Sequence, residues 1–161
     1  MSIETAVIKD IVPDSVLPYP EGLWNRVKYV FWKGITPGYR FGLNLLLRLR
    51  IIHHEGRQNF IIGKMAMGVR LEDFLRYLHS QGFWNNFIAW HDDDQVVSLR
   101  KLVDFEWQYH LRIFKDGEVR GHYECTPESH PRLHMKEIGM EERRDDFLRF
   151  VGDWVAPSSS K

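Results

Sequence analysis

The clearest helical pattern in the chain covers residues 71 to 81. Apolar residues recur there one helical turn apart, at Leu71, Phe74, Leu75 and Leu78. Two acidic residues stand in the expected first turn, where the helix dipole favours negative charge, and Gly82 is typical of a C-terminal cap. The pattern therefore predicts a helix over residues 71–81.

Two further segments have helical spacing. The first runs from Leu23 to Lys33, and we expect it to end at residues 34–38, which contain two glycines and a proline. The second runs from about Met140 to Val155, with a polar face of mixed charge that we expect to face solvent. Prolines in residues 12–21 predict an extended lead-in before the first of these helices.

Residues 43–53 fit two structures. Leucine or isoleucine occupies every odd position from 43 to 51, which is the period of a strand. Leu43, Leu46 and Leu47 also share a helical face, and leucine is a good helix former. We favour the strand, because residues 55–57 then form a turn into the apolar run of residues 60–62.

Strand character dominates the second half of the chain. Alternating or apolar segments predict strands over residues 87–90, 96–103, 105–114 and 119–125. Residues 91–94, a histidine and three aspartates, lie between two of these segments. They are typical of a solvated hairpin tip and not of a calcium loop, since no glycine or downstream glutamate completes the pattern.

The last two predicted strands also allow a prediction of their register. A two-residue loop between them would place Leu111 opposite His122 and mix apolar with charged side chains on one face. A three-residue loop, with Gly117 in the left-handed conformation, aligns His110 with His122 and leaves both faces consistent. We therefore predict the three-residue loop, with the apolar face packed mainly against the C-terminal helix.

Together these elements predict an α+β fold. We expect a mainly antiparallel, twisted sheet with helices packed on one face and a long C-terminal helix. Residues 1–156 are expected to form one domain, and residues 157–161 a frayed tail.

The composition narrows the class of protein. The chain has 161 residues, 43% of them hydrophobic, with 22 basic and 22 acidic residues and a formal net charge of zero. These values fit neither a disordered chain nor a nucleic-acid-binding protein that is basic throughout. One cysteine excludes an internal disulfide, no apolar run is long enough for a transmembrane segment, and the first residues lack a secretory pattern. We therefore expect a cytoplasmic location.

The predicted register creates a polar sheet face, which is the first candidate site. Its candidate ligand-binding residues are Gln108, His110, Arg112, Arg120, His122 and Glu124. His110 and His122, as cross-strand neighbours, are close enough to bind one metal ion, with Glu124 as a third ligand or a general base. We favour the alternative of an ordinary solvated sheet face, and the juxtaposition of two arginines also disfavours a dication.

Other histidine and cysteine positions carry weaker signals. His130 and His134 have the i, i+4 spacing of metal ligands, but Pro131 pushes His130 out of helical geometry. We therefore do not expect these two histidines to bind a metal as a pair, although they and Glu128 can fold back toward the polar face. Cys125 belongs to the apolar face, so we expect a buried, unreactive thiol.

A basic and aromatic stretch is the second candidate site. Residues 22–54 contain six lysines or arginines, six aromatic residues and no aspartate or glutamate. Such a surface suits nucleic acid or an anionic membrane, and Arg48 and Arg50 are the candidate nucleic-acid contacts. We favour the alternative that these cations balance the acidic final helix and that the aromatic residues belong to the core.

The motif search restricts the function classes. The sequence contains no Walker loop, dinucleotide-binding fingerprint, serine-hydrolase motif or paired-cysteine motif, and it implies no particular cofactor. The leading hypothesis is a small non-enzymatic binding protein whose many aromatic residues form a pocket or partner surface, for a small molecule, another protein or a second copy. The alternatives are a hydrolase-like, metal-assisted enzyme using His110, His122 and Glu124, and a nucleic-acid-binding accessory protein using residues 22–54.

Overall fold

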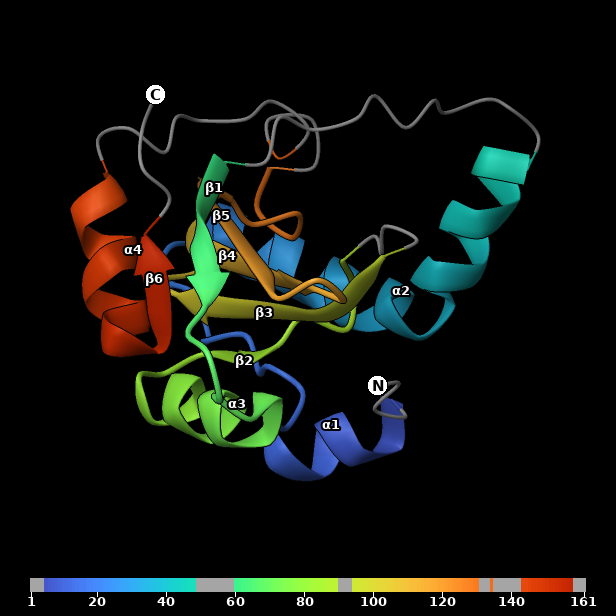
Figure 1. The fold of residues 1–161 in the computed structure, drawn as a ribbon. Helices are drawn as coiled ribbons and strands as arrows, with labels where there is room; N and C mark the ends of the chain where they lie inside the picture. The colour runs from blue at the N-terminus through green and yellow to red at the C-terminus, as the bar shows by residue number, and fades with distance from the viewer. Residues whose placement is uncertain (1–4, 49–59, 90–93, 131–133, 135–142, 158–161) are drawn as a thin grey trace.

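A central antiparallel sheet organises the molecule (Figure 1). The computed structural model describes residues 5–48, 60–89, 94–130, 134 and 143–157. The strands lie in the order β2-β3-β4-β5-β1-β6, and every neighbouring pair is antiparallel. Their bounds are β1 (Phe60–Met65), β2 (Trp84–Asn85), β3 (Gln95–Leu102), β4 (Trp107–Phe114), β5 (Glu118–Cys125) and β6 (Val155–Pro157).

Helices complete the α+β fold that the sequence predicted. They are α1 (Thr5–Ile11), α2 (Leu23–Arg48), α3 (Leu71–Ser80) and α4 (Arg144–Val151), followed by the short 3-10 helix η2 (Gly152–Trp154). The predicted helix over residues 71–81 is confirmed as α3, and Gly82 follows it with a φ of 88°. Within the described part of the chain, no helix has both the length and the apolar character needed to cross a membrane.

The apolar core lies between one face of the sheet and the helices α1, α3 and α4. The aromatic ring of Tyr109 on β4 contacts those of Phe147 and Phe150 on α4, with ring centroids 5.3 and 5.1 Å apart. Phe74 and Leu75 of α3 are completely buried in the same cluster. The prediction that the C-terminal helix covers the apolar face of β4 and β5 is therefore confirmed.

The predicted register of the β4–β5 hairpin is also confirmed. His110 pairs with His122 and Tyr109 with Tyr123, so the two imidazoles lie side by side across the strands. Gly117 has a φ of 82°, which side chains other than glycine rarely adopt, and its amide donates to the carbonyl oxygen of Phe114 at 3.0 Å. A three-residue loop thus sets the alignment of the two strands.

The prediction for residues 34–48 was wrong. The helix expected to end near residue 33 continues as α2 to Arg48, so residues 43–48 are helical and not a strand; residues 49–53 lie outside the described part. The leucines here are strong helix formers, and Pro37 is tolerated inside the helix, where proline typically produces a bend and not an end. A strand from this segment would also lack a place beside β1, because β5 and β6 occupy its two edges.

Two other boundaries differ from the sequence predictions. Residues 87–89 form a turn where a strand was expected, since the amide of Ala89 donates to the carbonyl oxygen of Asn86 at 3.2 Å. The C-terminal helix ends earlier than expected, because Gly152 has a φ of 51° and stops α4; residues 140–142 of the expected helix lie outside the described part. Val155 then pairs with Met65, so Pro157, expected in a frayed tail, belongs to strand β6.

Candidate functional site

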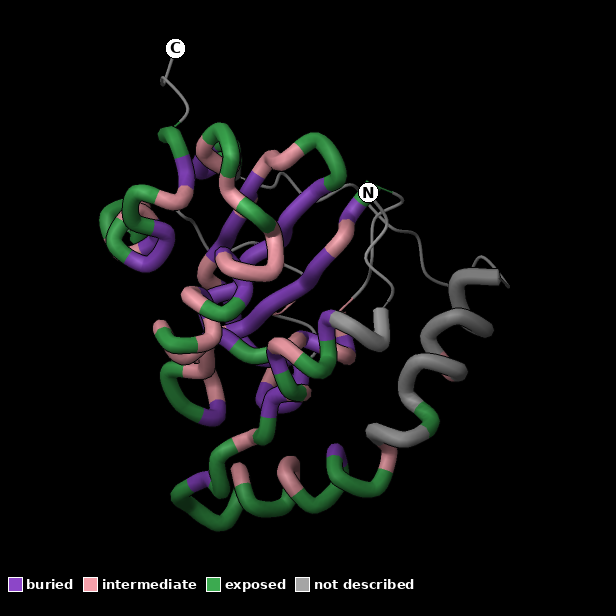
Figure 2. The backbone as a smooth tube through the Cα atoms, turned by 60° about the horizontal axis from the view of Figure 1, so that its bottom comes forward, coloured by how far each residue is buried: buried purple, intermediate pink, exposed green. Residues whose placement is uncertain are grey.

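The second face of the sheet is polar, as predicted, but it is buried. The exposed fraction of the side chains of His110, His122 and Glu124 is 1% each, and Gln108 is completely buried. The interpretation of this face as a solvated surface was therefore wrong. Figure 2 shows the buried class running along the central strands of the sheet.

Segments outside the hairpin cover this polar face. The residues after β5 turn back over it, and Glu128 Oε1 accepts a hydrogen bond from Arg100 Nη1 on β3 at 2.8 Å. Ser15 of the N-terminal lead-in accepts another from the same arginine side chain. Sequence periodicity predicts which residues share a face but not which loops fold over it, which explains why the burial was missed.

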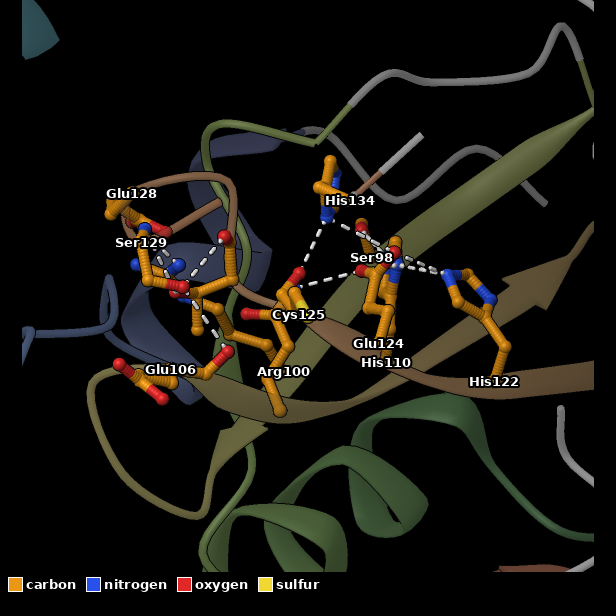
Figure 3. A network of polar contacts seen from close by, with 12 residues as sticks. Ser98, Arg100, Glu106, His110, His122, Glu124, Cys125, Glu128, Ser129 and His134 are labelled. Carbon is orange, nitrogen blue, oxygen red and sulfur yellow. Dashed lines mark hydrogen bonds and ion pairs between the residues drawn. The ribbon is translucent and has the colours of Figure 1, made fainter. Parts of the chain in front are cut away.

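Three potential metal ligands converge at the centre of the polar face (Figure 3). His110 Nδ1 lies 3.2 Å from His122 Nε2 and 3.1 Å from Glu124 Oε1, and His122 Nε2 lies 2.9 Å from Glu124 Oε2. Adjacent strands supply the histidines at directly opposed positions, and the period of two along β5 places Glu124 beside His122 on the same face. The predicted combination of these three residues is thus brought together.

Glu124 is held by contacts to both of its carboxylate oxygens. Its Oε1 accepts a hydrogen bond from Gln108 Nε2 at 2.8 Å, and its Oε2 lies 3.1 Å from His134 Nδ1. The same His134 nitrogen lies 2.8 Å from the backbone carbonyl oxygen of Cys125. These contacts fix the position of the carboxylate within the cluster.

The pKa values in the cluster separate an ionised carboxyl from a neutral imidazole. Burial alone would raise the pKa of Glu124, but the charges of His122 and His134 and hydrogen bonds from His110 and His122 hold it well below its usual range. Burial lowers the pKa of His110 well below its usual value, and the positive charge of Arg112 acts in the same direction, against the hydrogen bond to Glu124. At neutral pH Glu124 is therefore ionised and His110 uncharged, which are the states in which a carboxyl group and an imidazole bind a metal.

Ser98 is a functional candidate that the sequence analysis missed. Its hydroxyl oxygen lies 2.8 Å from His110 Nε2, the ring nitrogen that does not face the cluster. The β3–β4 register, with Leu99 opposite Leu111, puts Ser98 on the polar face. The alternation of Val97 and Leu99 with Ser98 and Arg100 was the available signal, but no turn motif fixed the register of this pair of strands.

Ser98, His110 and Glu124 form a hydrogen-bonded chain of the kind that activates a serine nucleophile. Ser98 lies in the middle of β3, however, and only 1% of its surface is exposed. A substrate carbonyl does not reach its hydroxyl in this conformation. We therefore assign Ser98 a positioning role, in which it orients the imidazole of His110.

The other predicted ligand-binding residues lie around the cluster. Gln108 is a direct partner of Glu124, and Arg112 is buried beside His110. Arg120 pairs with Arg112 in the register, yet it is partly exposed, forms an ion pair with Glu118 and lies over the ring of Phe114. The side chain of Arg120 is thus compensated by Glu118, which weakens the objection that two arginines would repel a dication.

The remaining candidates fall into three groups. The imidazole of His130 does not join the cluster; its Nδ1 lies 3.0 Å from Ser129 Oγ. The backbone of His130 is nevertheless linked to His134, whose amide donates to the His130 carbonyl oxygen at 2.9 Å. Cys125 is 2% exposed and burial raises the pKa of its thiol, as expected for an unreactive cysteine. Arg48 is the last residue of α2, while Arg50 and residues 91–93 lie outside the described part.

Comparison with known protein families, with curated proteins and with solved structures gave no match to this chain.

Proposed function

We propose that the protein binds a divalent transition-metal ion through His110, His122 and Glu124. The observation that carries this proposal is the convergence of the donor groups. His110 Nδ1 lies 3.2 Å from His122 Nε2, and one oxygen of the Glu124 carboxylate approaches each nitrogen, at 3.1 Å from His110 and 2.9 Å from His122. Ligand atoms bound tetrahedrally to zinc at about 2.0–2.1 Å lie about 3.3 Å from one another. The separation of the two imidazole nitrogens is already close to this value, and a rotation of the Glu124 carboxylate would bring one of its oxygens toward both nitrogens.

The donor set determines which metals fit. Two imidazole nitrogens and one carboxylate oxygen suit Zn²⁺ or Fe²⁺, whereas Ca²⁺ and Mg²⁺ prefer sites built from oxygen atoms. The three protein ligands leave further coordination positions for another group. His134 is a further nitrogen ligand to consider, because its Nδ1 lies 3.1 Å from Glu124 Oε2.

The contact between His110 and Ser98 supports the proposal, because it resembles the outer contacts that orient metal-bound histidines. Binding of a metal at His110 Nδ1 leaves the proton on Nε2, which then donates to Ser98 Oγ. Without a metal, the proton on Nδ1 would instead donate to Glu124, and Ser98 would be the donor to Nε2. The metal-bound and metal-free states of the protein therefore differ in which ring nitrogen of His110 carries the proton.

Burial favours a binding role over catalysis. All three ligands are 1% exposed, so a metal ion there would link β4 to β5 and not meet a large substrate. The proposal combines the non-enzymatic role of the leading hypothesis with the metal ligands of the alternative enzyme hypothesis. Arg112 near His110 is expected to lower the affinity compared with a site without an adjacent cation.

Zinc titration of the chelator-treated protein tests the proposal. We expect one zinc ion per chain, and binding weakened more than about a hundredfold in His122→Gln and Glu124→Gln, because each removes a ligand. Ser98→Ala retains all three ligands and should weaken binding only about tenfold. His79→Gln is the matched control, since His79 contacts Trp84 and the carbonyl oxygen of Phe83 and no residue of the cluster.

Three results would contradict the proposal. They are the absence of stoichiometric zinc in the folded wild-type protein, equal affinity in the wild type and Glu124→Gln, and an equal loss of affinity in His79→Gln. Circular dichroism of each variant without metal establishes that the fold is retained.

A further inference from the structure

Among the described side chains of helix α2, those that contact the rest of the molecule lie on one side of the helix. Asn25 Nδ2 donates to Glu106 Oε1 at 3.1 Å, and the ring of Tyr29 lies 5.4 Å from that of Tyr19 and 6.4 Å from that of Phe105. Trp32 is 5% exposed and completes this attached side. Asn25, Tyr29 and Trp32 are three to four residues apart, so they occupy one face of the helix.

The opposite side of α2 is apolar and exposed. Its large side chains have exposed fractions of 80% for Leu23, 72% for Trp24, 51% for Val27, 66% for Val30 and 62% for Phe31. Positions 23, 27, 30 and 31 follow helical spacing, and Trp24 lies on the same side as Phe31, two turns earlier, so the residues form one continuous stripe. Figure 2 shows this part of α2 at the edge of the molecule, largely in the exposed class. A continuous apolar surface of this kind indicates an interaction site.

Positive charge accompanies the apolar stripe. Helix α2 contains five lysines or arginines and no acidic residue. At 100° per residue, Arg26 and Lys33 lie on one border of the stripe and Lys28 on the other. Arg26 and Lys33 are both exposed. An apolar stripe between two borders of cations is the pattern of a helix that lies in the surface of an anionic membrane.

The composition of the stripe argues against two other partners. Three of its five side chains are aliphatic and have no ring to stack on a nucleic-acid base, which disfavours the nucleic-acid alternative. A second copy of α2 would bring like-charged helices together, because each helix carries only positive charges. An anionic lipid surface is attracted to the cations and accepts the apolar side chains.

We propose that residues 23–33 of α2 bind the surface of a bilayer that contains anionic lipid. The apolar stripe enters the interface between headgroups and acyl chains, and Arg26, Lys28 and Lys33 contact the lipid phosphates and carboxylates. The helix lies on the membrane and does not cross it, in agreement with the absence of a membrane-spanning helix in the described part. This inference is independent of the metal cluster.

Flotation of the full-length protein with lipid vesicles tests the inference. We expect binding to vesicles of phosphatidylcholine with about one-third phosphatidylserine, and much weaker binding to phosphatidylcholine alone. Phe31→Asp should reduce binding at least about tenfold, because it puts a charge in the apolar stripe. The double variant Arg26→Gln, Lys33→Gln should also reduce binding about tenfold, and the remaining binding should depend less on salt.

Matched controls are available elsewhere on the surface. Met67→Asp changes a fully exposed apolar residue between β1 and α3, and Lys115→Gln removes an exposed charge from the β4–β5 hairpin. Both variants should bind vesicles like the wild type. The inference is wrong if the protein binds neither vesicle, if Phe31→Asp and Met67→Asp bind equally well, or if the stripe instead forms a dimer that Phe31→Asp dissociates.

Discussion

The hydroxyl group of Tyr109 connects the sheet to helix α4. It donates a hydrogen bond to Asp146 Oδ2 at 2.7 Å, on the face of β4 opposite to His110. The pKa of Tyr109 is raised to about 12, mainly because the hydroxyl group is buried and also because it donates a hydrogen bond to Asp146. The same bond is the main reason that the pKa of Asp146 is lowered.

This pair predicts the pH dependence of stability in alkali. The tyrosine of the unfolded chain ionises near pH 10, whereas folded Tyr109 stays protonated to about pH 12. The contribution of Tyr109 to the free energy of unfolding is thus complete below pH 10 and is lost as the pH rises to 12. The loss amounts to roughly 2–3 kcal/mol. We expect Tyr109→Phe to lower the free energy of unfolding by about 1 kcal/mol at neutral pH and to reduce this alkaline loss.

Urea unfolding from pH 7 to pH 12 measures both effects. Tyr19→Phe is the control, because Tyr19 is 65% exposed and should leave the free energy of unfolding nearly unchanged. An unchanged alkaline loss in Tyr109→Phe would show that the buried hydroxyl does not cause it.

At the scale of residues, much of the candidate site is predictable from the sequence. Alternation along two strands, together with a glycine that permits a left-handed turn, is enough to pair His110 with His122 and to add Glu124. Ser98 was missed because no comparable constraint aligns β3 with β4. The contacts of Glu124 with His134 and of Arg100 with Glu128 depend on a loop that has no periodic pattern.

At the scale of elements, the close approach of α4 to the sheet depends on Gly121 of β5. A Cβ atom at this position would lie 2.7 Å from Phe147 Cε1 and 3.0 Å from Ile62 Cδ1. Phe147 and Ile62 are almost completely buried, so neither has free space to move into. The absence of a side chain at position 121 therefore permits the packing of α4 against β5 and β1.

We predict that Gly121→Ala lowers the free energy of unfolding by about 1–3 kcal/mol, since the added methyl group overpacks the core. Urea unfolding measures this change. Gly38→Ala in α2 is the matched control, because a Cβ there has no atom within 4 Å, and alanine should be neutral or stabilising by up to about 1 kcal/mol. Equal stability of Gly121→Ala and the wild type would mean that α4 can shift without cost.

The elements differ in how well the sequence predicts them. Helix α3 is recognisable because its apolar spacing, acidic first turn and final glycine all agree. Helix α2 is not, because its leucines fit two periods and Pro37 and the glycines suggest an end that does not occur. Strand β6 depends on pairing with β1, about ninety residues earlier, so no local pattern predicts it.

At the scale of the whole molecule, the sheet separates two interiors. One face packs apolar side chains against α1, α3 and α4. The other buries the histidine and glutamate cluster, which His134 contacts, and Arg100, which Ser15 of the lead-in and Glu128 contact. Helix α2 is attached at the edge by Asn25 and Tyr29 and carries the exposed apolar stripe. The proposed metal ion and the proposed membrane surface therefore occupy separate parts of the molecule, and each can be removed by substitution without the other.

The coordination sphere of bound zinc identifies the residues that hold the ion. X-ray absorption spectroscopy at the zinc edge, on protein loaded with one equivalent of zinc, reports the type and distance of each ligand. We predict nitrogen and oxygen ligands at about 2.0–2.2 Å, including two imidazoles, and the loss of one imidazole in His122→Gln. A sulfur ligand at about 2.3 Å, or a spectrum that His122→Gln leaves unchanged, would place the ion elsewhere and contradict the assignment to His110, His122 and Glu124.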